Sequence, residues 1–231
     1  MPTVFQPPSC IGGVTPWGVE WSARGVIESL EPLALARRVD RIRAVYAARL
    51  KSVTVVMDAP HDPHNGAAIL RSCDAFGIQC LHVVERIEPF LVARKVAQGT
   101  ERWVDIIRHS SAEQALSQLR AQSYALAVAH PLGELLPEDL NRIERLAVVM
   151  GNEHDGVCEQ LTRAADYTVR VPMRGFVESL NVSVTTALLL EAAVRDRVGD
   201  LDAQEQEFLL ARALLSTVPR AGEILKNLAP H

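Results

Sequence analysis

Two small polar residues stand at the opening of an apolar segment near the end of the sequence. Ser179 and Asn181 flank Leu180, and the chain then runs without a charge from Val182 to Leu190. A polar group at the mouth of a buried helix needs a partner, because leaving it dry and unpaired costs about 1–3 kcal/mol. Helix capping accounts for one of the two side chains. The presence of both favours a lining role for this turn in a binding site.

A second polar segment, Met150-Gly151-Asn152-Glu153, directly follows an apolar one. Gly151 permits a tight turn or the close approach of a ligand. Glu153 is a candidate for holding a substrate group or for orienting an arginine. The alternative is that Gly151 and Gly156 only shape a turn and that Glu153 begins a helix near Val157, where its charge favours the helix dipole. The local sequence leaves both interpretations open.

The third polar segment, His64–Arg71, places Asn65 and Arg71 six residues apart, nearly two turns of a helix. Asn65 by itself is typical of a helix cap, and Arg71 by itself is typical of a solvated surface charge. The residues between them, Ala67–Leu70, are apolar enough to be buried. We therefore expect a packed helix from which Arg71 projects.

Several common catalytic signatures are missing. The sequence has no G-x-G-x-x-G, no G-x-x-x-x-G-K-[ST] and no G-x-S-x-G, so dinucleotide-binding, P-loop and serine-hydrolase functions lack their motifs. A metal-dependent hydrolase could use His61, Asp62 and His64, but their spacing matches no familiar zinc pattern, and we predict no metal site. The four cysteines are scattered without a C-x-x-C pair, which predicts free thiols.

The elements that must position these residues are short apolar strands alternating with helices. Predicted strands are 53–57, 80–84, 103–107, 124–129, 146–150 and 168–171, and predicted helices are 65–76, 112–122, 157–164 and 182–198. Continuous apolar strands separated by helices indicate an α/β fold, a mostly parallel sheet with helices on both faces. Ligands bind beyond the carboxyl ends of strands in such sheets. Each polar segment follows a predicted strand, so we expect the three to converge on one crevice.

The flanking segments suggest further divisions of the chain. Residues 1–21 are rich in Pro and Gly and predict an irregular N-terminal extension. Residues 22–51 predict a helical, basic extension, residues 52–198 the α/β domain and residues 199–231 a helical C-terminal tail that packs on the core or on a partner subunit. The predicted apolar stripe of the extension consists of Leu35, Val39, Ile42, Tyr46 and Leu50.

The charge distribution bears on nucleic-acid binding. A net charge of −4 argues against coating nucleic acid with the whole surface. Residues 22–51, however, hold seven basic and three acidic residues. Arg37, Arg38, Arg41 and Arg43 are candidates for phosphate contacts, and the alternative is a solvated helix face with ion pairs. No apolar run approaches the roughly 20 residues that span a bilayer, and we expect a cytoplasmic protein.

In their order along the chain, the three polar segments resemble the motifs of the SpoU family of RNA ribose 2′-O-methyltransferases, in the SPOUT superfamily. Residues 64–77 (HNGAAILRSCDAFG), 148–156 (VVMGNEHDG) and 171–190 (VPMRGFVESLNVSVTTALLL) are similar to the first, second and third motifs. The resemblance extends from about Arg41 to Arg197. Through residues 41–43 and 99–104 it is strongest to the branch that methylates guanosine 18 in the D-loop of tRNA.

This resemblance implies a C-terminal segment threaded into a deep trefoil knot, an exception to the usual absence of knots. It also implies that S-adenosylmethionine, the cofactor, lies bent in that knot, held largely by backbone groups. The matching positions are Ala129, Gly151, Val171 and Leu180. Partners implied by the family are RNA, with tRNA first, and a second copy of the chain that completes the site, with no membrane and no metal.

Site roles also follow from the resemblance. Arg71 matches the catalytic arginine, Asn65 the asparagine that positions it or the methionine moiety, and Glu153 the glutamate of the second motif. Ser179 and Asn181 match the polar pair of the third motif. The implied reaction is in-line attack of a ribose 2′-oxygen on the sulfonium methyl group. Arg71 is the family's suggested base, but a guanidinium rarely gives up its proton and more easily fixes phosphate and ribose as a bidentate fork.

The chain also departs from the family pattern. It is acidic overall and short after the third motif, whereas relatives that methylate tRNA tend to carry basic flanks. These departures concern the choice of RNA more than the chemistry. A ribosomal RNA ribose methyltransferase and a non-catalytic RNA-binding or assembly protein with the same fold remain as alternatives.

Overall fold

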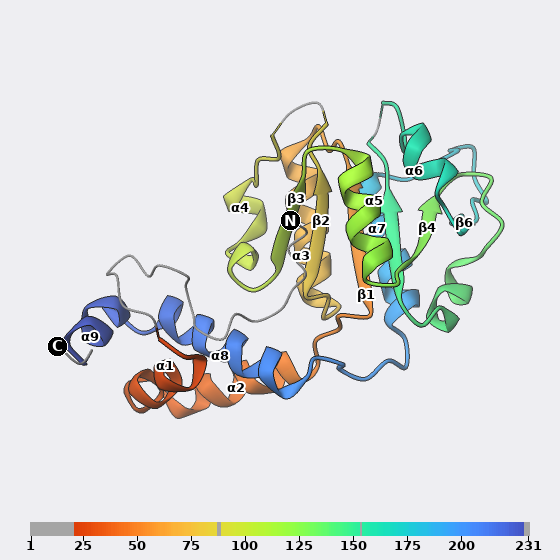
Figure 1. Cartoon of the computed structure of the whole chain (residues 1–231). Helices are drawn as coiled ribbons and strands as arrows, with labels where there is room; N and C mark the ends of the chain where they lie inside the picture. Colours follow the sequence, from red (N-terminus) through yellow and green to blue (C-terminus); the bar gives the residue numbers. More distant parts are fainter. Residues whose placement is uncertain (1–20, 87–88, 153, 229–231) are drawn as a thin grey trace. The chain divides into compact units, whose positions relative to one another are not determined.

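A computed structural model describes residues 21–86, 89–152 and 154–228 (Figure 1). These residues form two compact units. One unit spans Leu50–Val198, and the other combines the described chain up to Arg49 with the chain from Gly199 onward. None of the helices in the described ranges combines the length and the apolar composition needed to cross a membrane.

The larger unit is built on a six-stranded parallel sheet in the order β3-β2-β1-β5-β4-β6. The strands are β1 (Val53–Asp58), β2 (Cys80–Val84), β3 (Asp105–His109), β4 (Ala125–Ala129), β5 (Leu146–Met150) and β6 (Tyr167–Val169). The central strands β1 and β5 are buried along their whole length, which explains why their sequences are apolar without alternation. All six predicted strands are present. β3 begins two residues later than predicted, because Trp103 still belongs to a 3₁₀ turn and donates its backbone N–H to Thr100.

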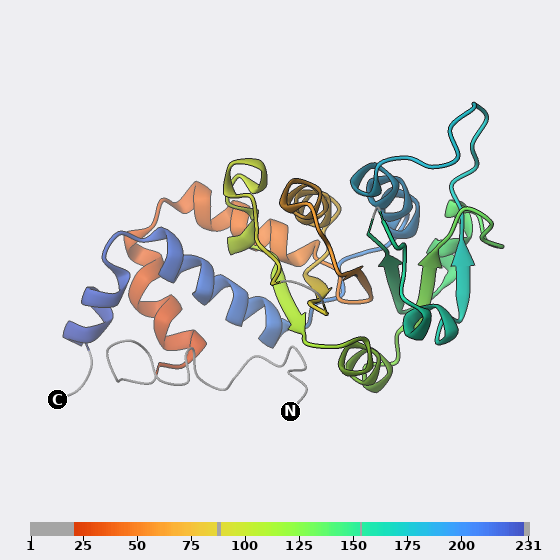
Figure 2. The same cartoon turned by 90° about the horizontal axis from the view of Figure 1, so that it is seen from above.

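Helices cover both faces of this sheet (Figure 2). They are α3 (Pro63–Ala75), α4 (Arg94–Ala97), η2 (Thr100–Arg102), α5 (Ala112–Ala121), η3 (Pro137–Arg142), α6 (Glu159–Arg163) and α7 (Val182–Val194). Apolar residues of α3 and α7 share a core with one face of the sheet, and those of α5 and α6 share a core with the opposite face. The predicted α/β architecture with helices on both faces is confirmed.

Some helix ends differ from the sequence prediction. α3 begins at Pro63 rather than Asn65, because Asp62 caps it by accepting a hydrogen bond from the backbone N–H of His64 at 2.8 Å. α7 ends at Val194 rather than Val198. The Arg197 guanidinium donates to the carbonyl of Ala193 at 2.8 Å, which satisfies a carbonyl that a longer helix would have used internally. α6 likewise begins at Glu159, two residues later than predicted.

The smaller unit is helical and joins the two ends of the described chain. It contains α1 (Ala23–Leu30), η1 (Glu31–Leu33), α2 (Ala36–Ala47), α8 (Ala203–Thr217) and α9 (Ala221–Leu228). Val26 and Leu30 of α1, Val39 of α2 and Leu210 and Leu214 of α8 share one buried cluster. Of the predicted apolar stripe, Val39 and Tyr46 are buried, but Leu35 is 64% exposed because it lies at the N-cap of α2.

β2 and β3 carry a buried pair of histidines. His82 Nδ1 lies 2.9 Å from His109 Nε2, and the two rings are stacked with their centroids 5.1 Å apart. Burial, with a smaller contribution from the charge of His109, lowers the pKa of His82 to about 3. Burial also lowers the pKa of His109. Both side chains are therefore neutral in the folded protein near neutral pH.

We expect this pair to make the free energy of unfolding decrease as the pH is lowered. Because these histidines bind protons more readily when unfolded, acid favours unfolding from about pH 6.5 down to the folded pKa, about 3 for His82. One such group gives a slope of about 1.4 kcal/mol per pH unit. Urea unfolding measured at several pH values between about 7 and about 5 gives the free energy of unfolding as a function of pH. This free energy should change less steeply with pH for His82→Gln than for the unsubstituted protein. Equal slopes would contradict this assignment.

Candidate active site

A cavity of about 250 Å³ lies at the carboxyl ends of β4, β5 and β6, and we call it the strand-end cavity. It is lined by residues 129–131, 150–152, 156–157, 169–171, 173, 178–180, 182 and 185. All four positions expected to hold the cofactor, Ala129, Gly151, Val171 and Leu180, are in this lining, and Ser179 is beside them. The structure thus brings together residues that are up to about fifty positions apart in the chain.

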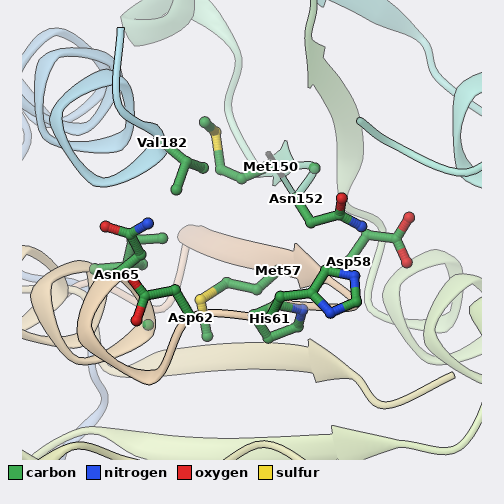
Figure 3. A pocket seen from close by; sticks show the side chains of 12 residues that line it. Met57, Asp58, His61, Asp62, Asn65, Met150, Asn152 and Val182 are labelled. Carbon is green, nitrogen blue, oxygen red and sulfur yellow. The ribbon is translucent and has the colours of Figure 1, made fainter. Parts of the chain in front are cut away.

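A smaller hollow of about 10 Å³ adjoins this cavity between α3, β1 and the end of β5 (Figure 3). It shares Met150, Gly151, Asn152 and Val182 with the strand-end cavity. Its remaining lining comes from residues 57–58, 60–62, 65–66 and 69. The first polar segment and the end of β5 therefore meet the beginning of α7, which is the convergence predicted from the sequence.

Asn65 and Asn181 are joined directly. The Asn181 amide Nδ2 donates to Asn65 Oδ1 at 3.0 Å, across 116 positions of sequence. Asn181 also caps α7, since its Oδ1 accepts from the backbone N–H of Ser183 at 2.8 Å. Asn65 lies in the first turn of α3, after Asp62 has supplied the cap, so capping does not account for it. The bond joins the first and third polar segments.

Arg71 lies outside both cavities. It is exposed on α3, and its guanidinium donates to the carbonyl of Val96 at 3.4 Å. Six residues of helix rotate a side chain by about 600°, so Arg71 points roughly 120° away from Asn65. The two side chains share a helix but not a face. Glu153, the remaining candidate of the second segment, lies outside the described residues.

The loop after β5 is closely packed on itself. A Cβ atom added to Gly151 would lie 2.2 Å from the backbone carbon of Gly156, so only glycine fits there. Asn152 and Gly156 form an antiparallel bridge, and Asn152 Oδ1 accepts from the backbone N–H groups of His154 and Asp155 at 2.9 and 2.8 Å. Asn152 is only 7% exposed, yet its Nδ2 has no partner among the described residues. A buried donor at the wall of both cavities is available for a ligand acceptor.

Asp58 is a site residue that the sequence did not reveal. It ends β1, its side chain is fully buried, and it accepts from Arg86 Nε at 2.8 Å and from the backbone N–H of Cys158 at 2.7 Å. The hydrogen bond to Asp58 raises the pKa of Arg86. Burial raises the pKa of the Cys158 thiol. The available signal was one acidic residue at the end of a buried strand, VTVVMD, that carries no other charge.

Gly66 and Phe90 form a second contact that the sequence did not reveal. A Cβ atom on Gly66 would lie 2.3 Å from the Phe90 ring, which is buried against α3. The backbone N–H of Phe90 donates to Glu85 Oε1 at 2.7 Å, and Arg108 donates to the carbonyl of Phe90 at 3.0 Å. These bonds hold the segment after β2 against the helix turn that carries Asn65.

His61 and Asp62, two of the candidate metal ligands, have other contacts in the structure. His61 packs edge-on against His154 with ring centroids 5.5 Å apart, and Asp62 caps α3. Within residues 21–86, 89–152 and 154–228, no cluster of three or more His, Cys, Asp or Glu side chains is arranged to hold a metal ion.

Comparison with known proteins shows which family the sequence resembles. Residues 52–191 match the SpoU rRNA Methylase family. The tRNA (guanosine(18)-2'-O)-methyltransferase of Escherichia coli (strain K12) is 32% identical over 161 residues, which cover 69% of this chain and 70% of that protein. The enzyme of the same name from Thermus thermophilus is 34% identical over 161 residues, covering 68% and 82%.

Solved structures show the same similarity. The TrmH/SpoU tRNA modifying enzyme of A. aeolicus superimposes with a TM-score of 0.72 and 27% sequence identity, covering 80% of this chain and 98% of that one. The AdoMet bound rRNA methyltransferase from Sinorhizobium meliloti gives a TM-score of 0.58 at 26% identity, covering 67% and 59%.

Proposed function

The chain belongs to the SpoU rRNA Methylase family, and we propose that it transfers a methyl group from S-adenosylmethionine to the ribose 2′-oxygen of guanosine 18 in tRNA. One observation carries the proposal. The strand-end cavity gathers the four expected cofactor positions. The Asn65–Asn181 hydrogen bond, which joins the first and third motifs, is additional support. The names of the similar proteins from E. coli and T. thermophilus supply the choice of nucleotide.

The lining of the strand-end cavity fits this cofactor. Ala129, Gly151, Val171 and Leu180 offer backbone groups to an adenosine, and the unpartnered Nδ2 of Asn152 offers a buried donor. When bound, S-adenosylmethionine supplies a methyl group that its sulfonium charge already makes labile. The remaining tasks for the chain are to position the acceptor hydroxyl and to remove its proton.

We propose that Arg71 contacts RNA rather than the cofactor. It is exposed, lies outside both cavities and is nearly two turns along α3 from Asn65. We assign its fork to the acceptor phosphate and ribose, because a guanidinium seldom gives up its proton. Asn65, Asn181 and Ser179 then orient the methionine end of the cofactor and the acceptor, and Glu153 keeps the role of the motif-two glutamate.

We propose a homodimer and a trefoil knot as further expectations from the resemblance. α7 exposes Val184 and Leu188, four residues apart on one helix face, and the loop before it exposes Phe176 and Val177. This apolar surface supports contact with a second copy of the chain. For the knot, the support is that α7 returns from the edge strand β6 to pack against both η3 and α3.

The proposed function is tested by methyl transfer. Purified protein, labelled S-adenosylmethionine and tRNA transcripts should give label at one guanosine of the D-loop, and a transcript with a 2′-deoxyguanosine there should give none. Transfer only to ribosomal RNA would instead identify the protein as a ribosomal RNA ribose methyltransferase. Saturable binding of RNA with no cofactor affinity would favour a non-catalytic RNA-binding protein.

We expect the arginines of α2 to contribute to tRNA binding. Arg37, Arg38 and Arg41 are exposed and have no ion-pair partner among the described residues, whereas Arg43 pairs with Glu31 at 2.6 Å. Replacing the first three with glutamine should weaken binding and reduce the slope of log K against log salt by about 2, since each phosphate contact contributes about 0.7–0.9.

Titrations of fluorescently labelled tRNA with the protein at several salt concentrations measure the slope of log K against log salt. Arg24→Gln is the matched control, because Arg24 lies in the same helical unit but already pairs with Glu28 at 3.3 Å. If the triple variant showed the same salt dependence of tRNA binding as the unsubstituted protein, the arginines of α2 would not contact RNA and α2 would be a solvated helix face.

A further inference from the structure

We infer that Asp58 is a positioning residue that holds residues 154–158, the described end of the loop after β5, against β1 and thereby sets the affinity for the cofactor. The inference rests on the proposed function, because it concerns the wall of the same cavity. Asp58 itself lines the adjoining hollow beside Asn152 (Figure 3). Its action on the cofactor is indirect, through the backbone of the loop.

The Asp58 carboxylate connects three segments of the larger unit. Its Oδ1 accepts from Arg86 Nε at 2.8 Å, and its Oδ2 accepts from Arg86 at 3.4 Å and from the backbone N–H of Cys158 at 2.7 Å. Asp58 ends β1, Arg86 follows β2, and Cys158 lies at the far end of the loop that follows β5. One side chain thus ties the far end of the loop to the end of β1.

A contribution to folding stability does not by itself explain why a carboxylate occupies position 58. The rest of β1 is buried and is apolar apart from Thr54, whose hydroxyl donates to the carbonyl of Cys80 at 2.7 Å. Replacing a buried ion pair with well-packed apolar groups is often neutral or stabilising. The carboxylate offers something that an apolar side chain lacks, which is an acceptor for the loop N–H of Cys158. Arg86, with 28% of its side chain exposed, neutralises the charge that this acceptor brings.

The hydrogen bonds of Asn152 are internal to the loop, and the carbonyls of Val157 and Cys158 accept from the Thr162 hydroxyl of α6 at 3.4 and 3.0 Å. The Asn152–Gly156 bridge and the bonds from His154 and Asp155 to Asn152 Oδ1 give the loop its shape. The bond between Cys158 and Asp58 joins that shaped loop to the neighbouring strand. Because Gly151, Asn152, Gly156 and Val157 line the strand-end cavity, a shift of the loop moves the cavity wall and the free Asn152 Nδ2 together.

The test uses Asp58→Asn, Arg86→Gln and the double variant, in which two neutral amides face each other. Asp166→Asn is the matched control, because Asp166 also accepts from an arginine, Arg120 at 2.6 Å, and from a backbone N–H, that of Leu126 at 2.7 Å, but lies away from both cavities. Titration calorimetry measures the dissociation constant for S-adenosylmethionine. Hydrogen exchange measures the protection of the amides from 154 to 158.

We expect both single variants to weaken cofactor binding about tenfold, to raise the cofactor KM similarly, and to leave kcat and the KM for tRNA within about twofold. The amides from 154 to 158 should exchange about ten times faster. The control should lose stability without these changes. Non-additive effects in the double variant would show that Arg86 acts through Asp58.

The outcomes separate this inference from the proposed function. If the unsubstituted protein does not bind S-adenosylmethionine, the proposed function fails, and exchange of the loop amides still tests the role of Asp58. If the unsubstituted protein binds the cofactor and Arg86→Gln binds it equally well with unchanged loop protection, the positioning role is overturned. Should Asp58→Asn fail to fold, Arg86→Gln and the double variant decide the question.

Discussion

Arg71→Ala is expected to lower the rate of methyl transfer about 100- to 1,000-fold or more while leaving the affinity for S-adenosylmethionine within about twofold. The separation follows from the position of Arg71, which is exposed and outside both cavities. Single-turnover transfer to tRNA measures the loss, and calorimetry measures the cofactor affinity. Little effect on folding is expected, since the side chain makes one long hydrogen bond to Val96.

Arg71→Lys distinguishes a positioning role from proton removal. Lysine keeps the charge but loses the planar fork, so a group that fixes phosphate and ribose should be rescued only in part, with the pH profile unchanged. A general base would instead shift the pH dependence of the rate toward the pKa of the new amine. Arg195→Ala is the control, because Arg195 is an exposed arginine paired with Glu191 on α7. Unchanged turnover in Arg71→Ala would remove this residue from the mechanism.

Much of the sheet could be predicted from the sequence because its central strands are buried on both faces. β1 and β5 have no exposed side and therefore show as continuous apolar segments. Helix ends were harder to predict, because they depend on single side chains. Asp62 before Pro63 was a readable cap, whereas the end of α7 depends on Arg197, whose guanidinium also donates to the distant carbonyl of Glu144 at 2.8 Å.

The site required contacts that no local pattern contains. Asn65 and Asn181 meet because α3 packs against α7. The order of strands predicted that their segments converge, but it did not predict this hydrogen bond. In the sequence Asp58 is only the residue that follows a predicted strand, and its role becomes apparent from its hydrogen bonds with Arg86 and Cys158. The different faces of Asn65 and Arg71, in contrast, follow from helical geometry alone.

The packing of the two chain ends against each other was also beyond local reasoning. α1 and α2 share a buried cluster with α8 and α9, but each helix alone shows only an apolar face without a named partner. An amphipathic pattern predicts that one face of a helix is buried, but it does not identify the element that packs against that face.

Gly151→Ala is expected to weaken S-adenosylmethionine binding about 100-fold and to lower the free energy of unfolding by about 1–3 kcal/mol, the usual cost of overpacking. The new methyl group would lie 2.2 Å from the backbone carbon of Gly156 and 2.4 Å from the backbone nitrogen of Val157. Backbone atoms cannot rotate away as a flexible side chain can, so the whole loop must move. Because that loop forms the wall of the strand-end cavity, the displacement reaches the ligand directly.

Gly175→Ala is the matched control for this substitution. Gly175 lies in the exposed loop before α7, and a Cβ atom there would meet nothing within 4 Å. Calorimetry with S-adenosylmethionine and urea unfolding of both variants measure the two effects. If Gly151→Ala bound the cofactor as tightly as Gly175→Ala does, the loop would not form the cofactor wall. A loss of stability with unchanged affinity would lead to the same conclusion, because the loop would then have moved without affecting the ligand.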